Sequence, residues 1–293
     1  MQNYQIITDS SCDLPARLTK QLEIQTVRLS VQFRGKEYLD YPEDDPRNRL
    51  DHHEFYEALR RGEPTSTTAV NPDQWKKAME PTLQRGQDIL VLAFSSGLSR
   101  TCESAEVAAQ ELREAYPQRQ LLVIDTLCAS LGQGLLVYLA GQQRLSGRSL
   151  EETAAYVRQT IPHLCHWFTV DDLMYLKRGG RIAASTALLG TMLQIKPILH
   201  TSDEGKLVTV SKARGRKAAM NALVDQVGKL GVDVSGQTMF ICHGDCLDDA
   251  NYVAQAIREK YHPQDVIVDY VGPVIGSHSG PGTLSVFFLG THR

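Results

Sequence analysis

The chain has 293 residues, of which 42% are hydrophobic and 22% are charged, and its formal net charge is −3. This length exceeds that of one ordinary small domain, so we expect two domains with a sizeable apolar core. The slight negative charge argues against a protein that binds nucleic acid or an anionic membrane surface.

No segment has the features of a membrane span or an export signal. The longest apolar stretches, such as residues 89–94, are only strand-sized. Met1 is followed by neither a basic leader nor a long apolar segment, so we expect no secretory signal and no stable membrane insertion. The six cysteines are scattered along the chain and are expected to be reduced thiols. These features predict a cytoplasmic protein.

The first half of the chain alternates predicted strands and helices. Residues 27–33 alternate apolar and polar side chains, as in a half-exposed strand, whereas residues 89–94 are apolar throughout, as in a strand buried in a parallel sheet. Asn71 and Pro72 are typical of a helix start. Strands are predicted at residues 5–7, 27–33, 89–94 and 121–124, and helices at 51–61, 71–85, after Ser99 as far as about Tyr116, and around 129–145. This order predicts an α/β domain with a parallel, doubly wound sheet.

After about residue 165 the alternation becomes less regular. Strands are predicted at residues 166–170, 207–211, 238–243, 265–271 and 284–289, and helices near 171–178, 184–194, 214–230 and 248–260. This mixture predicts a smaller α+β domain. We therefore divide the chain into an N-terminal domain, residues 1–164, and a C-terminal domain, residues 165–293.

Hydroxyl and acidic residues gather where three predicted strands lead into helices, at residues 8–11, 95–99 and 125–126. Ligands of open parallel sheets bind beyond the carboxyl ends of the strands, where helix N-termini favour an anion. Each junction could instead be simple helix capping. Together with a fourth hydroxyl cluster at residues 65–68, the three junctions favour a binding site.

Two further segments are candidates for the same site. Residues 272–282 are rich in glycine, which permits close backbone approach to a ligand, and contain His278; a plain turn is the alternative. Residues 176–182 place three cations beside two glycines. A solvated helix end explains Lys177 and Arg178 well, whereas Arg181 follows the glycines and is the better functional candidate.

Metal-binding and nucleotide-binding motifs are missing from the sequence. Cys242, His243 and Cys246 lack a second ligand pair with zinc spacing, so buried thiols are the simpler interpretation. The chain contains no nucleophile elbow, no phosphate-binding loop and no dinucleotide fingerprint. No metal or cofactor is expected.

In combination these segments resemble the DegV family, fatty-acid-binding proteins that include the FakB subunits of bacterial fatty acid kinase. The resemblance covers almost the whole chain, and its pieces occur in the family's order at residues 7–15, 67–72, 95–101, 123–126, 176–182, 196–199 and 272–282. Two departures are notable. Where the family usually has T-S-Q-P-S, this chain keeps hydroxyls only at Thr67 and Thr68. Arg100 replaces the second glycine of the family's S-S-G-L-S-G-T, which places a new cation near the site or its rim.

The resemblance implies a DegV-type fold with a long-chain fatty acid between the two domains, its tail in an apolar tunnel. The direct carboxylate contacts would be Thr67 and Ser99, with Thr68, Ser95 and Ser96 as neighbours. The choice between Ser96 and Ser99 stays open. His278 would complete the hydrogen-bond network, and Arg181 would lie near the entrance, where a partner could meet the head group.

By the same resemblance the protein would be a carrier that performs no chemistry. It would present its fatty acid to a separate dihydroxyacetone-kinase-like subunit, which forms an acyl phosphate. An alternative function is a serine hydrolase or acyltransferase that uses Ser99 or Ser96 as nucleophile and His278 as base. Asp9 or Asp125 would then orient the histidine.

Overall fold

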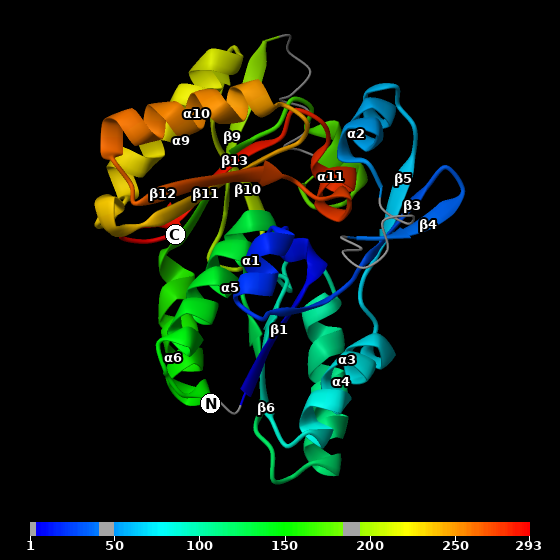
Figure 1. Cartoon of the computed structure of the whole chain (residues 1–293). Helices are drawn as coiled ribbons and strands as arrows, with labels where there is room; N and C mark the ends of the chain where they lie inside the picture. Colours follow the sequence, from blue (N-terminus) through cyan, green and yellow to red (C-terminus); the bar gives the residue numbers. More distant parts are fainter. Residues whose placement is uncertain (1–3, 41–49, 184–193) are drawn as a thin grey trace.

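The computed structural model describes residues 4–40, 50–183 and 194–293. These residues form a four-stranded sheet, a six-stranded sheet and a small three-stranded sheet (Figure 1). The predicted fold class, α/β with a parallel sheet and a further mixed region, is confirmed. Within the described ranges, no helix is both long enough and apolar enough to cross a membrane.

The four-stranded sheet is parallel throughout, with the order β2-β1-β6-β7. Its central strands are almost entirely buried because helices cover both faces. Helices α3 and α4 pack together beside the sheet, and α5 and α6 pack together on its other side (Figure 1). The elements are β1 (Tyr4–Asp9), α1 (Ala16–Gln21), β2 (Gln25–Val27), α3 (Pro72–Gln84), β6 (Asp88–Ala93), α4 (Thr101–Ala115), β7 (Leu121–Asp125), α5 (Ser130–Leu145) and α6 (Leu150–Thr160).

The six-stranded sheet has the order β10-β9-β8-β13-β11-β12 and is antiparallel except for the pair β11 and β12. Helices α9 and α10 pack on this sheet, and α5 contacts strands β8, β11 and β13. The elements are β8 (Leu164–Thr169), α7 (Met174–Arg178), β9 (Ile195–Thr201), β10 (Leu207–Arg214), α9 (Arg216–Leu230), β11 (Thr238–His243), α10 (Leu247–Tyr261), β12 (Asp265–Tyr270), α11 (Pro273–Ser279) and β13 (Leu284–Leu289).

The small antiparallel sheet extends from the first half of the chain towards the six-stranded sheet (Figure 1). It comprises β3 (Ser30–Phe33), β4 (Lys36–Leu39) and β5 (Thr65–Thr68), and α2 (His52–Arg60) lies in the connection between β4 and β5. The buried Tyr56 on α2 donates its hydroxyl to the carbonyl of Val271 at 2.8 Å. Arg60 forms an ion pair with Asp245, after β11. Helix α2 is therefore anchored to the second half of the chain.

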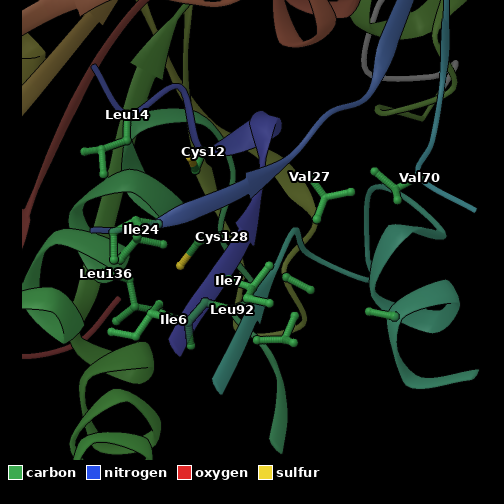
Figure 2. Packing of buried hydrophobic residues seen from close by; sticks show 14 of the residues in the cluster. Ile6, Ile7, Cys12, Leu14, Ile24, Val27, Val70, Leu92, Cys128 and Leu136 are labelled. Carbon is green, nitrogen blue, oxygen red and sulfur yellow. The ribbon is translucent and has the colours of Figure 1, made fainter. Parts of the chain in front are cut away.

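The hydrophobic core of the first half surrounds β1 (Figure 2). Ile6 and Leu136 lie on the side of α5, and Ile7 and Val27 point towards the opposite side. All four side chains are buried. The alternation of side chains along β1 therefore joins both helical layers into one core.

Several sequence predictions are confirmed, and others are corrected. The helix start at Asn71 is confirmed, because Asn71 and Gln74 form a reciprocal capping box. The single strand predicted at residues 27–33 is wrong. Val27 ends β2, and residues 30–33 form the whole of β3 in a different sheet. The break between them occurs where the amide of Leu29 donates to the Ser10 hydroxyl at 3.0 Å.

The glycine-rich segment is not a loop throughout, because residues 273–279 form α11. Pro273 at the first helical position and Gly280 with φ of +80° just past the end could have indicated this helix. Sequence reasoning also missed α1, β4, β5, β9 and α6. The helix predicted at residues 184–194 lies outside the described residues, except for Gln194. The domain boundary between residues 164 and 165 stays a prediction.

We expect Tyr56→Phe to lower the free energy of unfolding by about 1–3 kcal/mol, because it leaves the buried carbonyl of Val271 without its donor. Urea denaturation measures this effect. Tyr252→Phe is a matched control, since that exposed hydroxyl donates to Asn221 at the surface. Equal loss in both variants would contradict the anchoring role of Tyr56.

Candidate functional site

A cavity of about 260 Å³ lies where the three sheets meet. Both halves of the chain line it, since its wall includes the loop after β6, the start of α5, strands β8 and β13, and helix α11. Most of the wall is apolar, comprising Leu29, Phe94, Leu98, Phe168, Leu176, Leu207, Val271, Val274, Ile275 and Phe287. The cavity suits a mainly apolar ligand.

Four residues predicted for the site also line this cavity: Thr67, Ser99, Arg181 and His278. They come from β5, the loop before α4, the segment after α7, and α11, which are far apart in the sequence. The structure therefore brings together side chains that the sequence only suggested as separate candidates. These four residues therefore contribute polar groups to a mainly apolar wall.

Thr67 is directed inward by the alternation of β5. Thr65 and Thr67 are half-buried, whereas Ser66 and Thr68 are exposed on the other face. Thr67 pairs with Val31 of β3, and its Oγ1 lies 2.8 Å from Nε2 of His278. Residues 65–68 form a strand, so neighbouring side chains point to opposite faces. This explains why Thr67 reaches the cavity and Thr68 does not.

His278 lies in the last turn of α11 and packs against Gly179. A Cβ atom at Gly179 would lie 2.4 Å from Nδ1 of His278, so only glycine leaves room for the ring. Burial, and to a smaller extent the charge of Arg181, lowers the pKa of His278 to about 4. The imidazole is therefore neutral at physiological pH.

Ser99 lies in the turn that leads into α4. Its hydroxyl is 2.9 Å from that of Thr101 and accepts the Thr101 amide at 3.2 Å. The 15-residue helix that follows directs the positive end of its dipole towards this turn. An anionic group beside Ser99 is electrostatically favoured.

Arg181 is half-buried beside the same turn. It follows Gly180, whose φ of +71° ends α7, and its Nε donates to the carbonyl of Leu98 at 3.1 Å. The guanidinium also donates to the carbonyl of Gly179. Burial lowers the pKa of Arg181. The ordinary pKa of arginine is so high that the side chain nevertheless stays charged. No carboxylate within the described part of the chain pairs with it.

The structure places the other predicted neighbours outside the cavity wall. Ser95 is buried, but its hydroxyl donates to the carbonyl of Gly205 at 2.8 Å. Ser96 is exposed, and its amide donates to Asp125 at 3.2 Å. Between the two serines that the sequence left open, the cavity favours Ser99 over Ser96.

Among residues 4–40, 50–183 and 194–293, no Ser–His–Asp arrangement is assembled around His278. Nε2 of His278 is bonded to the hydroxyl of Thr67, and its Nδ1 faces Gly179. Asp9 is fully buried at the end of β1, where it accepts the amide of Phe94 at 2.8 Å. Asp125 accepts the amides of Ser96 and Leu127. Both carboxylates thus accept hydrogen bonds from backbone amides at the carboxyl edge of the four-stranded sheet.

Arg100 and several deeper residues also belong to the wall. Arg100 is exposed at the rim, where it forms an ion pair with Glu103 at 3.0 Å. Sequence reasoning noted Arg100 only as a departure from the family pattern. It missed His166, Thr201, Ser279, Thr283 and Ser285 as lining residues. The alternation of side chains along β8 and β13 could have indicated His166 and Ser285, if the sequence had shown which face of each strand meets the cavity.

In the described ranges, no three His, Cys, Asp or Glu side chains are grouped so as to hold a metal ion. Burial raises the pKa of Cys242 and of Cys246 to about 12 each, so both are protonated thiols.

Comparisons with known proteins agree with the fold. The family model for uncharacterised proteins of the DegV family matches residues 3–291. A DegV domain-containing protein of Clostridium perfringens is 44% identical over 290 residues, which cover 99% of this chain and 98% of that protein. The chain therefore belongs to the DegV family.

Solved structures of fatty-acid-binding relatives have the same architecture. A DegV family protein from Thermus thermophilus, described for its fatty acid binding, superposes with a TM-score of 0.88 at 30% identity, covering 99% of this chain and all of that one. DegV of Bacillus subtilis, described as a fatty acid binding protein, has a TM-score of 0.83 at 27% identity, with 99% of this chain and 100% of that chain covered.

We expect His278 to stay neutral until the pH falls to about 4. Because its pKa is lower in the folded protein than in the unfolded chain, the unfolded chain binds more protons between about pH 6.5 and pH 4, and stability falls as the pH is lowered through this window. NMR titration of the histidine ring nitrogens measures the pKa. The exposed His53, whose pKa is raised by its bond to Asp245, is the internal control. An ordinary pKa for His278 would contradict its burial.

Proposed function

We propose that this protein binds a long-chain fatty acid, with the acyl chain in the cavity and the carboxylate beside Thr67, Ser99 and His278. The observation that carries the proposal is one mainly apolar cavity with a cluster of hydroxyls and a neutral imidazole in its wall. The fatty-acid-binding relatives of the same fold support the choice of ligand.

The apolar wall accounts for the affinity. Each buried methylene contributes about 0.8 kcal/mol, so a chain of about fourteen contributes roughly 11 kcal/mol before the costs of ordering. A carboxylate removed from water needs hydrogen-bond donors in return. The polar cluster of the cavity supplies these donors without burying a salt bridge.

The protonation of His278 decides whether the Thr67 hydroxyl can donate its proton to the carboxylate. If Nε2 of His278 carries the proton, it donates to the Thr67 oxygen, and the Thr67 hydroxyl proton is left for the carboxylate. Ser99 can donate its own hydroxyl proton from the start of α4. In this proposal both hydroxyls donate to the carboxylate of one fatty acid in the cavity that they line.

The same geometry favours a carrier over a hydrolase. Nucleophilic catalysis needs a base within reach of the serine hydroxyl, and the hydroxyl of Ser99 is paired with Thr101 instead of an imidazole. We propose that the protein acts in the cytoplasm and presents its bound acid to a separate kinase that forms an acyl phosphate. Arg181 lines the cavity and is half-exposed, so it is the residue that we expect to contact that kinase.

Native mass spectrometry of the protein purified from cells tests the binding proposal. We expect one fatty acid per chain in the wild type, and a roughly tenfold or greater loss of affinity in Thr67→Val and in Ser99→Ala, because each leaves a buried carboxylate short of one donor. Thr68→Val is the matched control, since that side chain is exposed on the other face of β5.

Two outcomes would count against this proposal. A bare wild-type chain that stays bare after incubation with assorted fatty acids would exclude the carrier, and labelling by a fluorophosphonate would then favour the hydrolase. Full occupancy in both Thr67→Val and Ser99→Ala would show that the carboxylate lies elsewhere.

We expect Arg181→Ala to retain the fatty acid but to reduce acyl phosphate formation by a dihydroxyacetone-kinase-like partner severalfold, because the charge that meets the partner is lost. Arg178→Ala is the control, since its guanidinium lies over the ring of Tyr175 and outside the cavity wall. Loss of fatty acid from Arg181→Ala would instead place Arg181 among the ligand contacts.

A further inference from the structure

The turn that carries Ser99 is held by a hairpin from the other half of the chain. This turn, residues 95–99, follows β6 in the first half, whereas the hairpin tip, residues 202–206, connects β9 and β10 in the second half. Thr201 and Leu207, on either side of the tip, line the cavity. The hairpin tip therefore lies at the edge of the cavity.

Ser95 joins the turn to the hairpin tip. Its hydroxyl donates to the carbonyl of Gly205 at 2.8 Å and accepts the amide of Gly97 at 3.2 Å. A hydroxyl has a single proton to donate, so these two hydrogen bonds fix its direction. Ser95 is 0% exposed, so bulk water does not compete for either bond. The side chain is therefore a buried bridge between the two halves of the chain.

The backbones of the turn and the hairpin tip also approach closely. A Cβ atom at Gly97 would lie 2.7 Å from the carbonyl oxygen of Glu204, and one at Gly205 would lie 2.1 Å from Oγ of Ser95. Both distances are shorter than a real Cβ atom tolerates. The absence of a side chain at both glycines thus permits the contact that Ser95 bridges.

The contact reaches Ser99 through the backbone of the turn. The carbonyl of Ser95 accepts the amides of Leu98 and Ser99, each at 3.1 Å. The amide of Ser95 donates to the carbonyl of Cys128 at 3.0 Å, which fixes the start of the turn. The position of the Ser99 hydroxyl therefore depends on where Ser95 is held.

Ser95 itself does not face the cavity, since the wall includes Ser99 but not Ser95. Its effect on a ligand would have to be indirect. A hydrogen bond weakens steeply when its distance or angle departs from the favourable range, whereas apolar contacts are not directional. A small displacement of Ser99 would therefore weaken the bond to a carboxylate and leave the acyl-chain contacts almost unchanged.

We infer that Ser95 is a positioning residue for the fatty-acid carboxylate, because it locks the turn to the tip of the β9–β10 hairpin and so holds the Ser99 hydroxyl in place. This inference rests on the proposed fatty-acid binding and deepens it. The hairpin donates no hydrogen bond to the ligand but fixes a residue that does. Both halves of the chain then determine the geometry of the head-group site.

Competition binding to the delipidated full chain tests the inference. The probes are octadecanoic acid and its methyl ester, which share the acyl chain but differ in charge. We expect Ser95→Ala to lower the affinity for the acid about fivefold or more and that for the ester less than about twofold, because hydrogen bonds to a charged group are the stronger ones. Gly97→Ala, which keeps Ser95 but forces the turn from the hairpin, should have the same effect. Ser96→Ala alters an exposed neighbour and should change neither affinity.

A double-mutant cycle tests whether Ser95 acts through Ser99. We expect Ser95→Ala to cause no further loss of acid affinity when Ser99→Ala is already present, because the hydroxyl that it positions is gone. Losses that add in the double variant would overturn the route through Ser99.

The outcomes separate this inference from the proposal beneath it. Unchanged acid affinity in Ser95→Ala, or an equal loss for the acid and the ester, would overturn the positioning role but leave fatty-acid binding intact. Failure of the wild type to bind either compound would overturn the proposed function itself. If Ser95→Ala does not fold, the comparison of the acid and the ester on Gly97→Ala decides.

Discussion

Helix α5 is packed between the two large sheets, and the rest of the structure depends on this contact. Eleven of its 16 residues are buried, and it contacts β1 and β6 on one side and β8, β11 and β13 on the other. Such close packing requires small residues. A Cβ atom at Gly134 would lie 2.6 Å from the carbonyl of Cys12, and one at Gly132 would collide with His166. The first half of the helix, residues 130–137, is buried on all sides and thus holds the sheets at a fixed separation.

The cavity is a consequence of that arrangement. Because α5 begins at the carboxyl edge of the parallel sheet, Ala129 and Ser130 form part of the wall, and the six-stranded sheet closes another part with Phe168 and Phe287. The small sheet and α2 complete the enclosure from a third direction, where Tyr56 is bonded to Val271. Three separate pieces of structure therefore enclose a volume that none of them forms alone.

The polar groups of the cavity follow one physical rule. Charges that are buried need partners, so the wall contains hydroxyls and neutral imidazoles and keeps its cations at the edge. His278 is kept neutral by burial, while Arg181 is half-exposed and Arg100 is at the surface. Under the proposed function, a carboxylate in the cavity would be bound by neutral donors with positive charge nearby.

Local patterns in the sequence determined much of the fold. Uniformly apolar runs such as residues 89–94 identify buried strands, Asn71 with Pro72 begins a helix, and the ordered motifs identify the family, because these signals arise from neighbours in the chain. They also made Thr67, Ser99, Arg181 and His278 candidates for one site. Only the tertiary structure decided that Ser99 and not Ser96 lines the cavity, that residues 27–33 are shared between two sheets, and that His166 faces Gly132. The physical reason is that these outcomes depend on which face of each element is covered, and that depends on contacts between residues far apart in the sequence.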